Sequence, residues 1–389
     1  MNDIVRFHTA EYGHEPEVIV SAPAAISLMG EHTDYNDGRV LGFAVDRYLT
    51  VGVSRREDLS LRFYSANLNE RKRTTVPNIK FKREDRWANY QKGVLHELLQ
   101  LGYKLPGMEF TVSSSIEPGI GMGSSASLGV ASAFAVSKLL GANLSEFQII
   151  QSATMAESAF VGIEQPLSDQ LVTTAARKGR VILLDLHTLE YEHIRYVSED
   201  IKLILTASNV PVVSPHEELR ERRLKCGECV ALFKDRNLGS KLSEFTSTDL
   251  HNSMGMVPEE LRRICLHVIE ENERVSEAAA FLKRPDLVSF GRLMNRSHES
   301  LRDNYEVSCP EIDWLVKRAW EVEGVLGSRL IGPGFGGCTL SLIKSEAVDE
   351  YREHIKEYDR IFGFSPQVTV IDIVDGVREA PGLVDSVTV

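Results

Sequence analysis

The distribution of apolar and polar positions along the chain predicts strands and helices that alternate. Short runs rich in apolar and β-branched residues predict strands, at residues 17–21, 42–54, 108–113, 180–186, 201–207, 328–331, 339–343 and 367–374. Apolar or small residues at helical spacing predict helices, at residues 87–99, 124–140, 148–160, 217–233, 258–282, 286–297, 312–323 and 346–358. A polar, turn-prone stretch at residues 30–38 separates the first two strands. The pattern predicts a mixed α/β (α+β) protein.

The length of the chain favours two domains. A chain of 389 residues exceeds a comfortable single core, because domains usually contain roughly 100–200 residues. No internal repeat, low-complexity tract or proline-rich linker marks a boundary in the sequence. We place the boundary near residues 195–210, which divides the chain into residues 1–200 and 201–389.

Composition and charge narrow the classes of partner. Apolar residues make up 43% of the chain and charged residues 26%, which is typical of folded globular proteins. The net charge of −12 would repel phosphate backbones and anionic lipid, so nucleic acid and membrane are not expected partners. A protein of this charge that binds a nucleotide needs local positive potential, from backbone N–H groups, a helix N-terminus, Mg²⁺ or a few basic side chains.

The cysteines and the N-terminal residues indicate a reducing compartment. The odd set of five cysteines does not resemble a disulfide framework, and consists of Cys226, Cys229, Cys265, Cys309 and Cys338. The CxxC pair formed by the first two lies in a helical pattern without a second pair, which favours ordinary helix positions over a metal or redox site. The N-terminal residues lack the apolar core of a signal peptide, and no apolar run is long enough to cross a membrane. We therefore expect a cytoplasmic protein.

A glycine-rich segment directly precedes the helix predicted at residues 124–140. The residues of interest in it are Gly119, Gly121, Gly123, Ser124, Ser125, Ala126 and Ser127. Without Cβ atoms the backbone can turn N–H groups toward an anion, and the N-terminus of the following helix adds positive charge. Ser124 and Ser125 are candidates for contacting Mg²⁺ or a phosphate. The segment is neither a Walker A motif nor a Rossmann fingerprint, and a tight turn capped by serine is the alternative. By itself it predicts only an anion site.

Acidic residues that suit phosphoryl transfer occur at three places. Such a reaction needs a group that orients or deprotonates the acceptor hydroxyl, and oxygen ligands for Mg²⁺. Glu31, His32 and Asp34 are concentrated in one polar turn, which suits a polyhydroxylated ligand but also an ordinary solvated turn. Glu157 is a candidate for holding Mg²⁺, and Asp169 for accepting the hydroxyl proton. Either acid could instead be solvated or cap a helix.

A second glycine cluster lies at residues 332–338, between two predicted strands. A plain hairpin turn would explain its position, but it contains more glycines than a turn needs. We interpret it as backbone that approaches the ligand or the first glycine segment.

Four segments in order carry a resemblance to a known family. They are residues 30–38 (GEHTDYNDG), 118–127 (PGIGMGSSAS), 297–310 (SHESLRDNYEVSCP) and 328–338 (SRLIGPGFGGC). They resemble the galactokinase branch of the GHMP superfamily of small-molecule kinases, which includes homoserine, mevalonate and phosphomevalonate kinases. The third segment is nearly diagnostic, because chance would not reproduce so many irregular residues. Shorter matches at residues 87–93, 156–157, 160–162 and 169–170 extend the similarity over nearly the whole chain.

The resemblance implies a fold and a donor site. The fold would have an N-terminal domain like domain 2 of ribosomal protein S5, a C-terminal α/β sandwich, and the active site between them. ATP would bind on the loop at residues 119–127, and Trp87 and Tyr90 would lie near the nucleotide base. Mg²⁺ would lie near Ser125 and Glu157.

The resemblance also implies an acceptor and a reaction. Asp169 matches the family's catalytic aspartate, and Glu31, His32 and Asp34 match its sugar-hydroxyl contacts. The expected reaction is ATP-dependent phosphorylation of galactose at the anomeric hydroxyl, by a monomer or a weak homodimer.

The chain departs from the family pattern at four positions. The family arginine before the first segment is Ala25, so a cation that would polarise the aspartate or the γ-phosphate is missing. A glycine near the sugar is Pro166, a pocket tyrosine is Leu219, and the first serine of the phosphate loop is Gly123. Loss of a cation beside a developing charge costs roughly 10²–10³ in rate.

These departures leave two alternatives to galactose phosphorylation. Pro166 and Leu219 are compatible with a kinase for a substituted galactose, such as N-acetylgalactosamine or a C6-modified sugar. Ala25 is compatible with a catalytically weak relative that binds ATP and sugar as a sensor.

Overall fold

The computed structural model describes residues 3–117, 119–163, 167–198, 200–211, 215–234, 239–252, 255 and 257–380. Pro118 and Pro166 lie outside these ranges, so the expectation attached to Pro166 has no structural counterpart.

Eight strands of the described chain form a first sheet. They are β1 (Val18–Met29), β2 (Arg39–Arg56), β3 (Ser60–Ser65), β4 (Glu70–Thr75), β5 (Gly107–Ser114), β6 (Arg180–Asp185), β7 (Glu190–Arg195) and β12 (Arg378–Glu379). The order is β12-β1-β2-β5-β3-β4, and β6 pairs with both β2 and β7. Strands β3 and β5 run parallel, and the other pairs are antiparallel.

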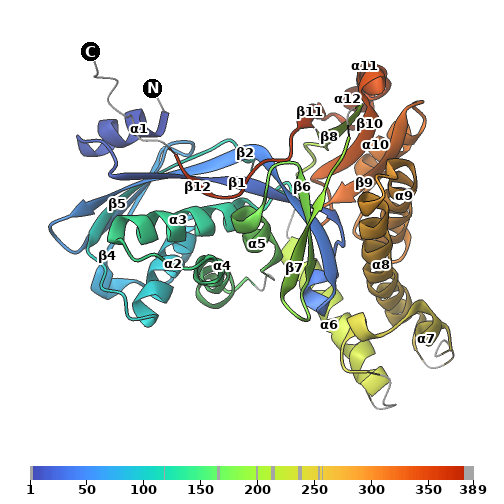
Figure 1. Ribbon diagram of the computed structural model, residues 1–389, viewed down its shortest axis with the longest axis horizontal. Coiled ribbons are helices and arrows are strands. Elements are labelled where there is room, and N and C mark those ends of the chain that lie inside the picture. The colour runs from blue at the N-terminus through green and yellow to red at the C-terminus, as the bar shows by residue number, and fades with distance from the viewer. Residues whose placement is uncertain are drawn as a thin grey trace.

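Helices cover one side of this sheet (Figure 1). Helix α3 (Ser124–Leu140) packs on β1 and β2 and is flanked by α2 (Ala88–Gln100), α4 (Glu146–Met155) and α5 (Ser168–Ala175). Small residues let α3 and α4 approach closely, since a Cβ added to Gly129 would stand 3.0 Å from the Cβ of Ala153. Helix α1 (Asp3–Tyr12) packs against β5 and β2 on the other side of the sheet (Figure 1).

The second sheet is built from the later part of the chain. Its order is β11-β8-β10-β9, all antiparallel, with bounds β8 (Ile201–Ala207), β9 (Val325–Ile331), β10 (Cys338–Lys344) and β11 (Gln367–Ile371). Helices α9 (Leu287–Asp303) and α10 (Pro310–Trp320) pack on β9, and α8 (Glu259–Lys283) packs beside α9. The remaining helices are α6 (Pro215–Lys234), α7 (Ser247–Asn252), α11 (Val348–His354) and α12 (Tyr358–Phe362).

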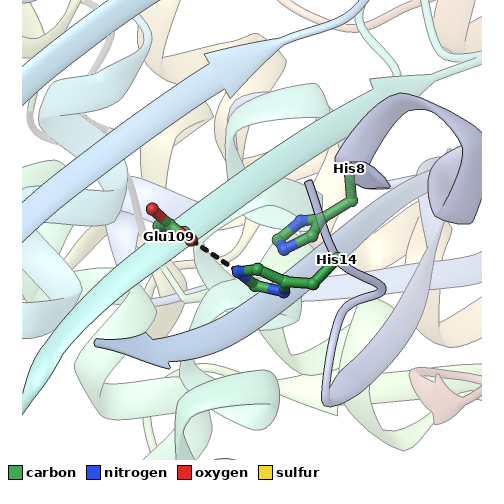
Figure 2. Close-up of side chains that lie close together, drawn as sticks. All are labelled: His8, His14 and Glu109. Atoms are coloured by element: carbon green, nitrogen blue, oxygen red, sulfur yellow. Dashed lines mark hydrogen bonds and ion pairs between the residues drawn. The ribbon is translucent and has the colours of Figure 1, made fainter. Parts of the chain in front are cut away.

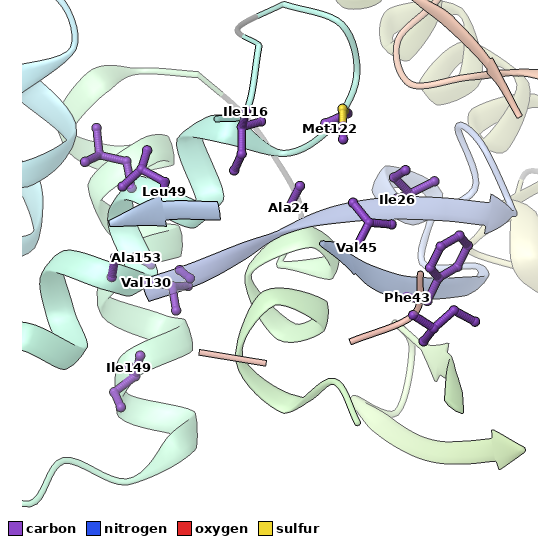
Figure 3. Packing of buried hydrophobic residues seen from close by; sticks show 14 of the residues in the cluster. Ala24, Ile26, Phe43, Val45, Leu49, Ile116, Met122, Val130, Ile149 and Ala153 are labelled. Carbon is purple, nitrogen blue, oxygen red and sulfur yellow. The ribbon is translucent and has the colours of Figure 1, made fainter. Parts of the chain in front are cut away.

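One apolar cluster extends through both sheets. Figure 3 shows part of it, where Ala24 and Ile26 of β1 and Phe43 of β2 meet buried residues from neighbouring elements. The same cluster continues to Leu205 of β8 and Leu340 of β10. The chain end also returns to the first sheet, because β12 pairs with β1. The proposed division at residue 200 stays a prediction, although it coincides with the change from one sheet to the other.

The predicted helices and strands are present, with shifted ends. The helix predicted at residues 346–358 was wrong as a single element, because α11 and α12 are separated by a turn that lets both Ile355 and Tyr358 enter an apolar cluster. Helices α1, α5 and α7 and strands β3, β4, β7 and β12 were not predicted. Strands β4 and β7 contain mostly charged and polar residues, since both are edge strands, and their sequences carry little apolar alternation.

The sequence did not predict the one disulfide seen among the described cysteines. Cys229 of α6 and Cys265 of α8 form a disulfide, because these helices pack side by side and place both residues in a buried cluster. Cys226, Cys309 and Cys338 are free thiols. Within the described ranges, no helix has the length and apolar character needed to cross a membrane.

Candidate active site

The first glycine segment leads from β5 into α3. Gly119, Gly121 and Gly123 all have positive φ, of 83°, 81° and 60°. This left-handed conformation is strained for other residues. A Cβ on Gly121 would stand 2.8 Å from the Cα of Gly332, so the two glycine clusters contact each other through their backbones. This confirms the interpretation of residues 332–338 as backbone that approaches the first glycine loop.

Two cavities meet at this loop. The smaller, of about 250 Å³, is lined by Glu31, His32, Asp34 and Asp169, among others. The larger, of about 650 Å³, is lined by Trp87, Tyr90, Leu128, Glu157 and neighbouring residues. Both cavities include Gly119, Ser124 and Ser125 in their walls. The loop therefore lies between a polar, acid-lined space and a more apolar one.

Asp169 stands in the first turn of α5, facing the smaller cavity. Its carboxyl lies close to the glycine loop, since a Cβ on Gly123 would be 3.1 Å from Asp169 Oδ2. Burial raises its pKa to about 8, and the nearby charges of Asp34, Glu157 and Glu31 add to the rise. Such a raised pKa is typical of a group that exchanges protons near neutral pH.

Glu157 and Ser125 form a pair at the border of the two cavities. Ser125 Oγ donates to Glu157 Oε1 at 2.7 Å, and Gln170 Nε2 donates to Glu157 Oε2 at 2.9 Å. Glu157 lies in a π-helical turn (Ala156–Val161) that follows α4, a feature often found at functional sites. Burial raises its pKa to about 7, which the two hydrogen bonds oppose. A buried carboxylate beside a hydroxyl supplies the oxygen ligands that Mg²⁺ prefers, so these residues fit that ion.

The polar turn after β1 brings three predicted residues to the smaller cavity. Glu31 Oε1 accepts the Gly332 N–H at 2.8 Å, and burial raises its pKa to about 7. Asp34 Oδ2 accepts a hydrogen bond from Ser168 Oγ at 3.3 Å, and burial raises its pKa as well. His32 Nδ1 is bonded to Tyr35 Oη at 2.8 Å, and burial lowers its pKa well below the usual value, so the ring is neutral. The sequence-predicted sugar residues thus converge on one space.

Three of the departures lie at or beside the same space: Gly123 and Leu219 line the smaller cavity, and Ala25 lies next to Gly123. Ala25 is buried on β1. Ala25 and Asp169 both lie next to Gly123: a Cβ added to Gly123 would be 3.4 Å from the Ala25 Cβ and 3.1 Å from Asp169 Oδ2. Leu219 of α6 lines the smaller cavity. An arginine at position 25 would therefore have faced Asp169, and alanine leaves this side of the acid without a charge.

Trp87 lies apart from the glycine loop but lines the larger cavity. It precedes α2, and its Nε1 donates to Glu70 Oε2 at 3.2 Å. The bond holds the indole at the cavity wall. The structure thus brings together the predicted loop, metal and acid residues, with Trp87 at the far side of the larger cavity.

Sequence reasoning missed two arginines near the site. Arg223 lines the smaller cavity, its guanidinium lies 4.5 Å from the Tyr35 ring centroid, and its charge lowers the pKa of Asp34. Arg223 follows Leu219 by four residues, so both lie on the same face of α6. This spacing could have identified Arg223 from the sequence. Arg329 is buried on β9, beside Glu31. In the sequence, Arg329 could have been identified only as a single arginine within an otherwise apolar strand.

A separate cluster of His8, His14 and Glu109 lies away from both cavities (Figure 2). Their potential ligand atoms lie within 4.8 Å of one another. However, His8 is already bonded to the hydroxyls of Ser54 and Thr111, at 3.1 and 2.9 Å. Glu109 is paired with the guanidinium of Arg56 as well as with His14. Because these contacts engage the ligand atoms, we interpret the cluster as an anchor for α1.

Comparisons with known proteins agree with this geometry. The galactokinase galactose-binding signature matches residues 6–55, the GHMP kinases N-terminal domain matches residues 89–177, and the GHMP kinases C-terminal domain matches residues 278–360. Galactokinase from Thermotoga maritima is 37% identical over 361 residues, covering 92% of this chain and 99% of its own. Galactokinase from Bacillus subtilis is 33% identical over 366 residues, covering 93% and 94%.

Solved structures show the same relationship. The Lactococcus lactis galactokinase complexed with galactose superimposes with a TM-score of 0.93 at 28% identity, over 97% of this chain and 99% of that one. Mevalonate kinase from Methanococcus jannaschii, at 18% identity and a TM-score of 0.66, shares the fold. Because curated relatives above 30% identity align over nearly the whole chain, and the solved fold agrees, this protein belongs to the galactokinase family of the GHMP kinases.

Proposed function

We propose that this protein transfers the γ-phosphoryl group of ATP to the anomeric hydroxyl of galactose. The observation that carries the proposal is the meeting of two cavities at one glycine loop, with Asp169 on the wall of the smaller cavity. A sugar in one cavity and a nucleotide in the other would hold acceptor and donor on either side of that loop. The relatives named galactokinase, and the neighbour solved with galactose, favour galactose over a substituted sugar.

The donor side would be held largely by backbone. The loop residues that we assign to the phosphates are Gly119, Gly121, Gly123, Ser124, Ser125, Ala126 and Ser127. Their N–H groups and the N-terminus of α3 offer positive potential to phosphate oxygens. Ser127 would act by fixing the start of α3, since its N–H donates to Gly123 O at 2.9 Å and its Oγ to Pro23 O at 2.8 Å. Trp87 would border the base in the larger cavity.

Ser125 and Glu157 would hold Mg²⁺ at the junction of the cavities. Bound there, the ion would offset negative charge on the phosphate oxygens. Glu157 is oriented for this task by Gln170, whose amide occupies one carboxylate oxygen. Burial disfavours the ionised form of Glu157 and raises its pKa to about 7, so a cation bound there would stabilise the carboxylate.

On the acceptor side, Glu31, His32 and Asp34 would bind sugar hydroxyls. Asp169 would orient the anomeric hydroxyl and accept its proton as the phosphoryl group is transferred. The position of Ala25 beside Asp169 means that no side chain of residue 25 offsets developing charge. We therefore expect real but slow turnover, about 10²–10³ below that of an enzyme with arginine there.

A direct assay tests the proposal. Release of ADP from ATP should depend on galactose, and the product should be galactose 1-phosphate. Asp169→Asn should abolish turnover while ATP binding, measured by calorimetry, persists. The matched control is Asp349→Asn, an acid whose side chain is 93% exposed on α11. Turnover that is absent with galactose at saturating ATP and Mg²⁺ would reject the proposal.

The cytoplasmic location and the monomeric or weakly dimeric state remain expectations for this enzyme. Light scattering coupled to size exclusion would measure the oligomeric state.

A further inference from the structure

A buried arginine from the second sheet reaches the sugar-binding turn. Arg329 of β9 has no exposed surface. Its Nη1 donates to the carbonyl oxygen of Leu28 at 3.0 Å, and its Nη2 lies 3.4 Å from Glu31 Oε1. A guanidinium in a dry interior is costly unless its charge is paired. Its carboxylate partner is Glu31, on the wall of the smaller cavity.

The backbone on both sides of Glu31 is tied to the same half of the molecule. The Gly30 N–H donates to Glu271 Oε1 of α8 at 3.0 Å, and the Glu31 carbonyl is bonded to His267 Nε2 at 3.1 Å. Glu271 Oε1 also accepts Ser297 Oγ at 2.8 Å. Several contacts therefore hold the turn that contains Glu31, and the turn would keep its fold without Arg329. What Arg329 alone supplies is a positive charge beside the Glu31 carboxylate.

We propose that Arg329 is a positioning residue for sugar binding, which favours the ionised form of Glu31 and aims its carboxylate into the smaller cavity as a hydrogen-bond acceptor. The inference rests on the proposed function, because it takes Glu31 as a contact of the sugar. It adds a fully buried residue of the second sheet to a set of expected sugar contacts that all lie in the turn after β1.

Charges from several elements face Glu31. Burial raises its pKa most, Arg329 and the Gly332 N–H oppose that rise, and Asp34 and Glu271 add to it. Its own charge in turn raises the pKa of Asp169. The rings of His32 and His267 are neutral, because burial lowers the pKa of each. Arg274 pairs with Glu271 at 2.7 Å. Arg329 is thus the cation that directly favours the ionised form of Glu31.

The test measures galactose affinity by calorimetry without ATP, from pH 6 to pH 9. In Arg329→Met, Glu31 should be protonated at neutral pH. Because the sugar then loses a charged hydrogen-bond acceptor, the Kd for galactose at pH 7 should rise at least about tenfold. As pH rises, Glu31 should ionise, and the ratio of variant to wild-type Kd should fall toward one. The KM for ATP should change less than twofold. Arg329→Lys keeps the charge, so its ratio should stay near one throughout.

Two further variants separate this role from a structural one. The galactose Kd of Glu31→Gln should itself be independent of pH, so its ratio to the wild-type Kd should grow as wild-type Glu31 ionises, and adding Arg329→Met to it should have no further effect. Arg222→Met is the matched control, because Arg222 is also buried but binds the carbonyls of Tyr305 and Glu306 at 2.8 and 3.1 Å. Its galactose Kd ratio should not vary with pH. If Arg329→Met fails to fold, Arg329→Gln removes the charge while keeping a donor toward Leu28, and gives the same comparison.

The outcomes are distinguishable from failure of the proposed function. A wild type that neither binds nor phosphorylates galactose would reject the function itself. A wild type that phosphorylates galactose, together with a charge-removing variant whose Kd ratio is unity or independent of pH, would overturn this inference alone. Additive effects of Glu31→Gln and Arg329→Met would also overturn it.

Discussion

At the scale of single residues, the smaller cavity collects carboxyl groups whose pKa values are raised by burial and, to a lesser extent, by one another. Burial and mutual repulsion raise the pKa of Asp169 to about 8 and that of Glu31 to about 7. Glu157 beside the glycine loop is raised to about 7 as well. With alanine at position 25, Asp169 has no arginine from β1 to offset this effect. The ionisation of Asp169 is therefore expected to control the rate.

Turnover should rise with pH through the pKa of Asp169. The carboxylate is the form that accepts a proton, so kcat with saturating ATP and galactose should increase as pH rises toward and past about 8. A bound cation would lower the pKa of Asp169 and so shift the rise in kcat to lower pH. The pH profile of kcat is therefore measured at several Mg²⁺ concentrations. A kcat that falls steadily between pH 6 and pH 9 would contradict the assignment.

The stability of the protein should show the opposite trend. The pKa of Asp169 is raised from 3.8 in the unfolded chain to about 8, so the folded state binds more protons between these values. Its contribution to stability is fully present below pH about 4 and is lost as pH rises through about 8. Asp169→Asn, which is neutral at all pH values, should therefore unfold at a higher temperature than wild type at pH 8.5. Calorimetric melting of both proteins from pH 6 to pH 9 measures the difference.

At the scale of elements, the contact between the two glycine clusters joins the phosphate loop to the β9–β10 hairpin. Sequence patterns predicted both loops and the helix at residues 124–140, whose bounds match α3. They left open whether the second loop approaches the ligand or the first loop, and the packing of the two sheets decided that the two loops touch. The polar edge strands β4 and β7 were missed for a local reason, since their sequences lack apolar alternation.

Two glycine substitutions measure this contact. Gly119→Ala introduces only left-handed strain of about 1–2 kcal/mol, since nothing lies within 4 Å of its Cβ position. Gly121→Ala adds a clash with Gly332, which should cost about 1–3 kcal/mol more. Denaturant unfolding of both variants should reveal the difference. Equal destabilisation by the two substitutions would mean that the loops separate easily.

The pairing of α6 with α8 offers a second test at this scale. The Cys229–Cys265 disulfide closes a loop with a sequence separation of 36, so its reduction should cost up to about 4 kcal/mol. Reductant should lower the melting temperature of the wild type and leave that of Cys229→Ser unchanged. Identical responses of the two proteins would show that the bond does not form in solution.

At the scale of the whole molecule, the end of the chain fastens the second sheet to the helix that carries Asp169. After β11 the chain pairs with Val45 and donates from Gly376 and Val377 to the carbonyls of Ala176 and Thr173. The chain then adds β12 to the edge of the first sheet. Late residues thus stabilise the C-terminal end of α5.

Truncation tests this coupling. Removal of residues 372–389 should lower both the melting temperature and kcat, because the end of α5 loses two hydrogen bonds and β1 loses its edge partner β12. Removal of residues 381–389 is the control, since β12 and these bonds remain. A shorter protein with unchanged kcat would show that α5 needs no support from the chain end.

The sequence alone determined the family, most of the elements and most of the candidate residues, because these depend on local spacing and on motifs. The loop at residues 119–127, the acids Glu31, Asp34 and Asp169, and the departure at Ala25 were all visible in it. Only the tertiary structure decided which of them face one space, which carboxyls raise the pKa of others, and that Arg329 from a distant strand contacts Glu31. Such properties depend on burial and distance between remote segments, and a linear pattern contains neither.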